Sequence, residues 1–135
     1  MRVAIDSNVL VAAFATHGLC HSLLEICLSN HQIIVSEDVL EEVSVALQQK
    51  IKLPPSVVKD VIAYLRKQSK LESPVPVPPD ACRDPRDLKV LGLAVASKAD
   101  CIVSGDKDLL VLKNFQGIDI LSPRDFWQTL QISGH

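Results

Sequence analysis

The sequence lacks a long uninterrupted apolar run. Its most apolar N-terminal stretch, residues 3–15, is interrupted by Asp6 and preceded by one basic residue, Arg2. A membrane-spanning helix needs roughly 18 apolar residues, and a signal peptide needs a basic segment before its apolar core. We therefore expect no membrane segment and no signal peptide in this chain, which indicates a cytoplasmic protein.

Paired cysteines are also absent. The four cysteines form no CxxC pair, and no histidine stands at the spacing of a zinc ligand: Cys20, Cys27, Cys82 and Cys101. Small secreted proteins often carry a framework of disulfides. The cysteine pattern here favours reduced thiols in a reducing compartment, and it gives no indication of a zinc site.

An overall excess of basic charge is missing as well. The chain has 14 lysines and arginines against 16 aspartates and glutamates, and its net charge is −2. No general positive field therefore attracts nucleic acid. Residues 48–70 differ, because one acid, Asp60, stands among six basic residues: Lys50, Lys52, Lys59, Arg66, Lys67 and Lys70. This segment is either a solvated helix face or a flank that contacts phosphates.

The composition that is present is typical of one globular domain. Of the 135 residues, 47% are hydrophobic and 22% are charged, which is enough apolar material for one buried core. The sequence contains no internal repeat and no linker long enough to divide it. We therefore expect residues 1–135 to form a single domain.

Short apolar strands alternate with helical segments along the chain. The strands are expected at 2–5, 32–36, 101–104 and 118–121, and the helices at 7–15, 22–29, 37–49, 54–68, 84–99, 107–112 and 122–130. Residues 73–82 contain four prolines and are expected to form an extended connector. Apolar strands separated by helices predict an α/β fold, a three-layer α/β/α sandwich around a central parallel sheet of about four to five strands.

Polar residues stand where several of these elements meet. Ser36 and Asp84 have the position of helix N-caps, and Pro85 fits the first turn that follows Asp84. Asp6 and Asp106 each follow a strand, and Asp87 lies in the first turn of its helix. Because ligands of open parallel sheets bind outside the carboxyl ends of the strands, we expect these residues to converge at one edge of the sheet.

Glu41 and Glu42 are separated by their direction on the helix. The apolar face of this helix consists of Val39, Leu40, Val43, Ala46 and Leu47. At 100° per residue, Glu42 flanks that face and Glu41 points almost directly away from it. Glu42 is therefore the glutamate expected to reach inward.

Four carboxylates that point to one place need a compensating charge. Asp6, Glu42, Asp87 and Asp106 would otherwise repel one another, and some would stay protonated at neutral pH. One or two hard divalent cations with oxygen ligands, Mg²⁺ or Mn²⁺, resolve this conflict. Each acid alone also fits a helix cap or a surface position, so the hypothesis rests on the set.

Four stretches of the sequence resemble the PIN domain. They are "AIDSNVLVAAF", "IIVSEDVLEEV", "RDPRDLKVLGLAVASKADCIVSGDKDLLVL" and "IDILSPRDF", and together they cover the chain from Arg2 to about Leu130. The resemblance is closest to the branch of toxin components of toxin–antitoxin systems, the relatives of VapC-type toxins. It implies a compact α/β/α sandwich and a metal-dependent endoribonuclease that cuts single-stranded regions of RNA.

The resemblance also implies roles for individual residues. The acids of the family fall on Asp6, Glu42, Asp87 and Asp106, as catalytic residues and ligands of Mg²⁺ or Mn²⁺. Supporting positions around the ligands are Ser7, Asn8, Ser104 and Asp108, and expected contacts to the RNA are Lys50, Lys52 and Arg86. The expected partners are a cognate antitoxin and a second copy of the chain. Asp84 and Asp108 each remain open as a ligand or a helix cap, with the cap favoured for Asp108.

Three positions depart from the family pattern. Ser7 stands where the family commonly has threonine, and it keeps the hydroxyl. Arg86 and Leu88 stand where an acid and an asparagine are common. Arg86 places a cation beside Asp87, where it either weakens the binding of metal or contacts a phosphate.

Two other functions fit parts of the sequence. A haloacid-dehalogenase-like phosphatase has a similar first strand and nucleophilic aspartate, but it requires a second aspartate where this chain has Asn8, which cannot act as a general acid. A catalytically weak or inactive PIN-fold module that binds RNA or protein is the other alternative, because of Arg86.

Overall fold

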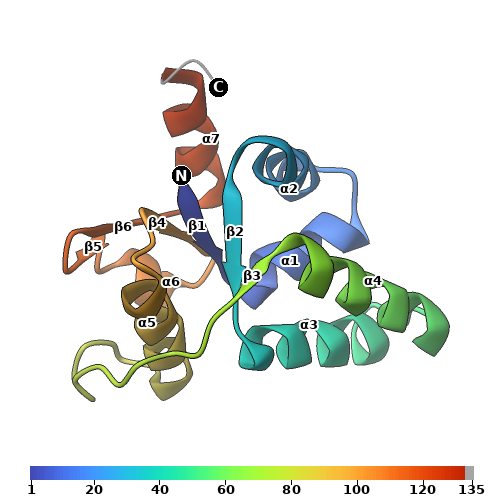
Figure 1. The fold of residues 1–135 in the computed structure, drawn as a ribbon, viewed down its shortest axis with the longest axis horizontal. Coiled ribbons are helices and arrows are strands. Elements are labelled where there is room, and N and C mark those ends of the chain that lie inside the picture. The colour runs from blue at the N-terminus through green and yellow to red at the C-terminus, as the bar shows by residue number, and fades with distance from the viewer. Residues whose placement is uncertain (133–135) are drawn as a thin grey trace.

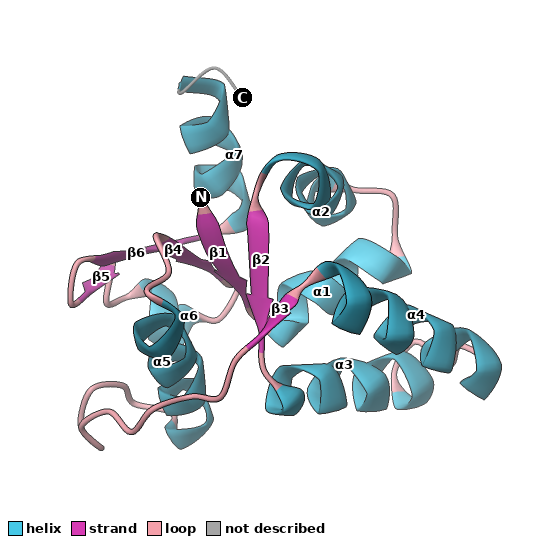
Figure 2. Cartoon of the chain, viewed as in Figure 1, coloured by secondary structure: helices cyan, strands magenta, loops and turns pink. Residues whose placement is uncertain are grey.

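The computed structural model describes residues 1–132 as alternating strands and helices (Figure 2). The strands are β1 (Arg2–Ile5), β2 (Gln32–Val35), β3 (Lys70–Leu71), β4 (Cys101–Val103), β5 (Asn114–Phe115) and β6 (Ile118–Leu121). The helices are α1 (Ser7–Ala15), α2 (Leu19–Asn30), α3 (Glu37–Gln49), α4 (Pro55–Gln68), α5 (Pro85–Ser97), α6 (Lys107–Leu110) and α7 (Pro123–Ile132). Residues 72–84 form neither helix nor strand, as the prolines predicted.

The strands form one sheet with the order β3-β2-β1-β4-β6-β5. Strands β3, β2, β1, β4 and β6 are parallel, which confirms the expected parallel sheet. The short strand β5 was not expected, and it pairs antiparallel with β6. Gln116 and Gly117 connect these two strands with positive φ angles of 51° and 84°, the conformation of the tight turns that join hairpins.

Helices cover both faces of the sheet (Figure 1). Helices α1 to α4 lie on one side, and α5 lies on the other, where it packs against β1, β2 and β4. Val3, Ala4 and Ile5 are all buried although successive strand residues point to opposite faces. Burial on both faces is why β1 is apolar from Val3 to Ile5, and it confirms the three-layer α/β/α arrangement.

The extended connector packs tightly against α5 at Gly92. The backbone N–H of Val75 donates to the carbonyl oxygen of Gly92 over 3.2 Å. A Cβ atom built on Gly92 would lie 2.1 Å from the carbonyl oxygen of Val75. A glycine therefore stands in the middle of this helix because the connector leaves no room for a side chain.

We expect Gly92→Ala to destabilise the protein, although alanine is the better helix former by about 1 kcal/mol. The added methyl group must displace the backbone of the connector, and forced overpacking costs about 1–3 kcal/mol. Thermal unfolding followed by circular dichroism measures the effect as a lower Tm. A Tm above that of the wild type would show that helix propensity dominates and that the connector yields easily.

Two expectations from composition can be compared with the structure. All four cysteines are free thiols, as their spacing predicted. Within residues 1–132, no single helix is long and apolar enough to cross a membrane. Helices α1 and α2 reach the required apolar length only together, across a bend of 106°.

Candidate active site

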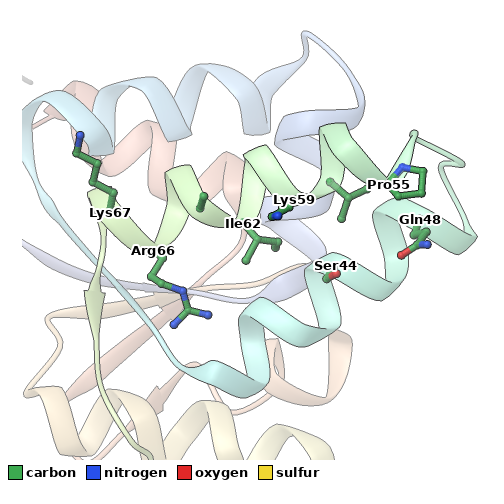
Figure 3. A pocket seen from close by; sticks show the side chains of 9 residues that line it. Ser44, Gln48, Pro55, Lys59, Ile62, Arg66 and Lys67 are labelled. Carbon is green, nitrogen blue, oxygen red and sulfur yellow. The ribbon is translucent and has the colours of Figure 1, made fainter.

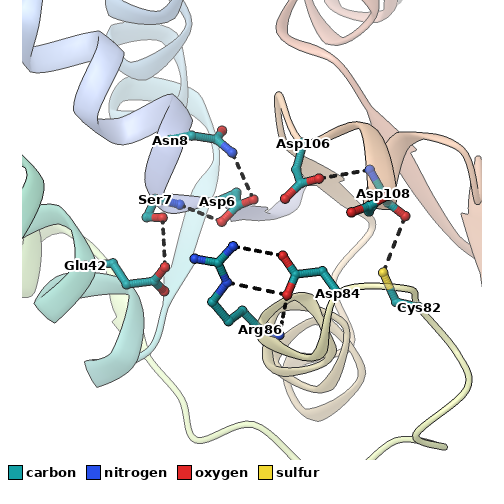
Figure 4. A network of polar contacts seen from close by, with 9 residues as sticks. All are labelled: Asp6, Ser7, Asn8, Glu42, Cys82, Asp84, Arg86, Asp106 and Asp108. Carbon is teal, nitrogen blue, oxygen red and sulfur yellow. Dashed lines mark hydrogen bonds and ion pairs between the residues drawn. The ribbon is translucent and has the colours of Figure 1, made fainter.

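The four acids selected from the sequence line one small pocket at the carboxyl ends of β1 and β4. The two strands are paired at Ile5 and Val103, and the residues that follow them bring Asp6 and Asp106 to the same edge. The first turn of α5 adds Asp87. Helix α3 adds Glu42 (Figure 4). The pocket has a volume of about 130 Å³ and is lined by Asp6, Ser7, Asn8, Glu42, Asp84, Arg86, Asp87, Val90 and Asp106.

Asp6 is buried, with 5% of its surface exposed, and both of its oxygens accept hydrogen bonds. Its Oδ1 accepts from the backbone N–H of Ser7 over 2.8 Å, so Asp6 is also the N-cap of α1. Its Oδ2 accepts from the Ser104 hydroxyl over 2.7 Å and from the Asn8 amide over 3.2 Å. These bonds fix the carboxylate in one orientation and explain why an acid interrupts the apolar N-terminal run.

Ser104, Asn8 and Ser7 have the supporting positions that the sequence suggested. The Ser104 hydroxyl, which donates to Asp6, accepts from the backbone N–H of Asp106 over 3.0 Å. The Asn8 side-chain carbonyl accepts from the N–H of Gly105 over 3.0 Å, which ties α1 to the segment after β4. The Ser7 hydroxyl donates to Glu42 over 3.4 Å. These contacts fix the positions of Asp6, Glu42 and Asp106 relative to one another.

The favoured interpretation of Asp108 as a helix cap was wrong. The N-cap of α6 is Asp106, whose Oδ1 accepts from the backbone N–H of Asp108 over 2.8 Å. The helix starts immediately after Asp106, so the side chain of Asp106 reaches the first free N–H groups. Asp108 lies two residues later, inside the first turn of the helix. The side chain of Asp108 is thereby left available to the site.

A second group of neighbouring carboxylates shares only Asp87 with the expected four. Oxygen atoms of Asp84, Asp87 and Asp108 all lie within 4.8 Å of one another. Asp84 does cap α5, since its Oδ1 accepts from the N–H of Arg86 over 3.0 Å, but it also belongs to this trio. The sequence had left Asp84 open as a ligand or a helix cap, and its position is compatible with both. The sulfhydryl of Cys82 adds a bond to the Asp108 carbonyl over 3.4 Å.

Burial and, to a lesser degree, neighbouring carboxylates raise the pKa of three acids. Burial raises the pKa of Asp6, and the charge of Asp106 raises it further. The hydrogen bonds from Ser104 and Ser7 lower it, but they do not cancel the effect of burial. Partial burial and the charge of Asp6 raise the pKa of Glu42. Burial, the adjacent carboxyl group and charge of Asp106, and the charge of Asp6 raise the pKa of Asp87 to about 7. Perturbed acids in a pocket are typical of functional sites.

Asp87 provides the test of whether a divalent cation fits this pocket. The residue is 5% exposed, and its Oδ2 is buried without a hydrogen-bond partner. A buried carboxylate oxygen without a partner is costly. The donors around it are carboxylate oxygens, the ligands that Mg²⁺ and Mn²⁺ prefer. The residues present therefore fit such an ion.

We expect Asp87→Asn to stabilise the protein at pH 8 in the presence of EDTA. An acid with a pKa of 3.8 unfolded and about 7 folded makes the folded chain less stable as the pH rises between those values. The neutral amide avoids this loss, so the Tm advantage of the variant should be largest above pH 7 and vanish near pH 4. About 1 kcal/mol corresponds to roughly 3–5 °C in a chain of this length.

Added Mn²⁺ supplies the matched control for that measurement. It should raise the Tm of the wild type at pH 8 more than the Tm of Asp87→Asn, because the amide is a weaker ligand. If the two proteins have equal melting temperatures in EDTA at pH 8, the buried charge of Asp87 carries no cost.

Arg86 is the only cation among the residues that line the pocket. Its guanidinium lies between Glu42 and Asp84 (Figure 4), with Nη2 3.0 Å from Asp84 Oδ2 and Nε 3.4 Å from Asp84 Oδ1. These bonds hold the pKa of Asp84 below its usual range. Of the departures from the family pattern, Arg86 is therefore the one that changes the electrostatics of the site.

A groove between α1 and α3 continues from the pocket. It has a volume of about 480 Å³ and shares four residues with the pocket: Ser7, Asn8, Glu42 and Arg86. Lys50 lines its far part, whereas Lys52 is not among the lining residues. Glu41 also lines this groove, so the expectation that it points away from the site region was too simple. Glu42 alone of the two glutamates lines the acidic pocket.

The basic segment that the sequence singled out borders a second groove, between α3 and α4 (Figure 3). This groove has a volume of about 560 Å³, and its lining includes Lys59, Arg66 and Lys67 but no acid. Arg66 forms an ion pair with Glu37 of α3. The groove is larger than the acidic pocket, but it contains no group suited to hold a cation or to move a proton.

The fold and the pocket define the class of protein: an α/β/α sandwich with a carboxylate-rich pocket at the carboxyl edge of its parallel sheet. The family model of the PIN domain matches residues 2–108. The chain belongs to the PIN domain family, which confirms the resemblance seen in the sequence.

A solved structure has the same fold. The crystal structure of VapBC2 from Rickettsia felis bound to a DNA fragment from their promoter contains a chain that superimposes with a TM-score of 0.62. The match covers 90% of this chain and 98% of that chain at 15% sequence identity. No curated protein matches the sequence.

Proposed function

We propose that this protein is a metal-dependent endoribonuclease that hydrolyses phosphodiester bonds in single-stranded regions of RNA. The observation that carries the proposal is the unpartnered, buried Oδ2 of Asp87 in a pocket of carboxylates. Such a pocket repels a phosphate diester unless cations neutralise it. Membership of the PIN domain family supports a nuclease among the possible metal-dependent hydrolases.

Asp6, Asp87 and Asp106 would hold one or two Mg²⁺ or Mn²⁺ ions, with Glu42 as a ligand directly or through water. When bound, such an ion lowers the pKa of a water molecule and offsets charge on the scissile phosphate. Ser104 and Asn8 orient Asp6 by their hydrogen bonds, and fixed orientation of ligands strengthens metal sites. Asp84 and Asp108, which lie close to Asp87, extend the ligand set on one side.

The groove between α1 and α3 is the proposed path of the RNA strand to the pocket. Arg86 at the junction and Lys50 in the far part supply the positive charges for the phosphates. Lys52 follows α3 outside the lining of the groove, so its contribution would be a longer-range attraction. The groove and the acidic pocket share four lining residues, and a single strand can enter the groove without unpairing.

A small antitoxin protein and a second copy of the chain are the proposed protein partners. The solved structure with the same fold is a VapBC2 assembly. An antitoxin that covers the pocket would keep the nuclease inactive in the cytoplasm, where we place the protein. Size-exclusion chromatography with light scattering tests the dimer, and co-expression with the product of a neighbouring small gene tests the antitoxin.

A non-catalytic PIN-fold module is the second candidate, and a specific contact favours it. Arg86 already occupies both oxygens of Asp84 at the mouth of the pocket, and this contact reduces the carboxylate charge that is available to a metal. Such a protein would bind RNA without cutting it.

The test of these functions is incubation of purified protein with end-labelled single-stranded RNA in Mn²⁺ or EDTA. The nuclease gives internal cuts in Mn²⁺ and none in EDTA, while the binding module shifts the RNA on a native gel and leaves it intact. A phosphatase would turn over p-nitrophenyl phosphate. No internal cleavage at any Mn²⁺ concentration contradicts the proposed nuclease.

A further inference from the structure

We propose that the side chain of Arg86 changes its partner when metal binds. The metal displaces the guanidinium from Asp84, and the guanidinium then binds a phosphate of the RNA in the groove between α1 and α3. This inference rests on the proposed nuclease function. It assigns to Arg86 a role that couples the binding of metal to the binding of substrate.

Arg86 and the metal compete for the same oxygen atoms. The guanidinium donates to both oxygens of Asp84, through Nη2 to Oδ2 and through Nε to Oδ1. One oxygen of Asp84 lies within 4.8 Å of carboxylate oxygens of Asp87 and Asp108, and these three acids form a group that could hold a metal ion. Asp87 Oδ2 is buried and without a hydrogen-bond partner. A cation drawn to Asp87 therefore meets a neighbouring ligand whose oxygens are already occupied.

The ion pair between Arg86 and Asp84 is weak enough to be broken when metal binds. The side chain of Arg86 is 86% exposed, and that of Asp84 is 19% exposed. The guanidinium lies largely in water, which screens the ion pair, and the arginine side chain loses freedom in forming it, so the pair contributes little to stability. The backbone N–H of Arg86 donates separately to Asp84 Oδ1. The cap of α5 therefore survives when the guanidinium leaves.

The side chain of Arg86 has a second position available to it in the groove between α1 and α3. Arg86 lines both the acidic pocket and the groove between α1 and α3, so a change of side-chain rotamer moves its charge from one to the other. A planar guanidinium binds a phosphate with two parallel hydrogen bonds. In that position Arg86 contacts the strand next to the scissile bond.

The consequence is a reciprocal coupling. Metal frees Arg86 for RNA, and RNA that holds Arg86 frees Asp84 for metal, so each ligand strengthens the binding of the other. Removal of the guanidinium should have opposite effects on the two ligands: tighter binding of metal in the absence of RNA, and weaker binding of RNA. If Arg86 had only a structural role, its replacement would weaken the binding of metal and of RNA alike.

The test compares Arg86→Gln with the wild type and with Lys89→Gln. Lys89 is a basic residue of the same helix that does not line the pocket. It forms an ion pair with Asp38 over 3.6 Å. Electron paramagnetic resonance of free Mn²⁺ gives the metal Kd without RNA, and steady-state cleavage gives KM for RNA. We expect Arg86→Gln to lower the Mn²⁺ Kd and to raise KM, each about fivefold, the low end of typical coupling between two sites. Lys89→Gln should change neither.

An unchanged or higher Mn²⁺ Kd in Arg86→Gln would overturn the competition, and an unchanged or lower KM would overturn the transfer to RNA. Melting curves in EDTA check that both variants are folded. If the wild-type protein binds no Mn²⁺ and cuts no RNA, the proposed nuclease itself fails. If the wild type binds and cuts but Arg86→Gln matches it in both measurements, this inference alone fails.

Discussion

Asp6→Asn should abolish metal-dependent cleavage of RNA, with a rate at least about a hundredfold below that of the wild type, a barrier increase of about 2.7 kcal/mol. Asp6 lies at the carboxyl end of the central strand, where Ser104, Asn8 and the N–H of Ser7 fix its carboxylate. The amide loses the negative charge that a metal ligand supplies at this position. Cleavage of labelled RNA in Mn²⁺ measures the effect.

We expect Asp6→Asn to fold, because an amide oxygen at this position can still accept from the N–H of Ser7 and cap α1, and the Ser104 hydroxyl can accept instead of donate. The amide nitrogen would then face the Asn8 amide, which donates to Asp6 in the wild type, so a melting curve in EDTA checks the fold. Asp60→Asn is the matched control, because Asp60 is exposed on α4 and outside the lining of the pocket. Equal cleavage by Asp6→Asn and the wild type would contradict the assignment of the active site.

Glu42→Gln should lower the rate of cleavage at least tenfold, about 1.4 kcal/mol, while Glu41→Gln should cleave like the wild type. The two glutamates have the same charge and helix propensity, so both changes affect α3 similarly and little. They differ in place: Glu42 lines the acidic pocket and accepts from Ser7, and Glu41 lines only the adjoining groove. The initial rate at several Mn²⁺ concentrations measures both variants.

The dependence on Mn²⁺ shows what Glu42 contributes. If it contributes affinity for the metal, much of the lost rate should return at higher Mn²⁺ concentration. Loss in both variants would indicate a general effect of charge near the RNA. Loss in Glu41→Gln alone would show that the wrong glutamate has been assigned to the site.

Local sequence signals located most of the elements correctly. Helix α3 begins directly after Ser36, whose hydroxyl accepts from the N–H of Val39 over 3.1 Å, and α5 begins after Asp84. These starts were predictable because a cap involves residues two or three positions apart in the chain. The apolar strands were predictable because burial on both faces of a parallel sheet excludes polar residues from them.

Other features had no local signal. The strand β5 consists of two residues, too few for a pattern, and it exists because the turn at Gly117 brings it beside β6. The cap of α6 was assigned to Asp108 when Asp106 makes it, because two acids in "GDKD" fit the position equally well by sequence. The sequence left Asp84 open as a ligand or a cap, and only the structure shows that it caps α5 and also lies beside Asp87 and Asp108.

The sequence by itself determined the alternation of strands and helices, the position of Asp6 and Asp106 at strand ends, and the side of α3 on which Glu42 lies. Each of these follows from hydrogen bonds and side-chain directions within a few residues. Only the tertiary structure decided that Asp84, Asp87 and Asp108 come within 4.8 Å of one another and that Arg86 bonds to Asp84. Those contacts depend on the angle at which α5 and α6 meet the sheet, which is set by packing between segments distant in the chain.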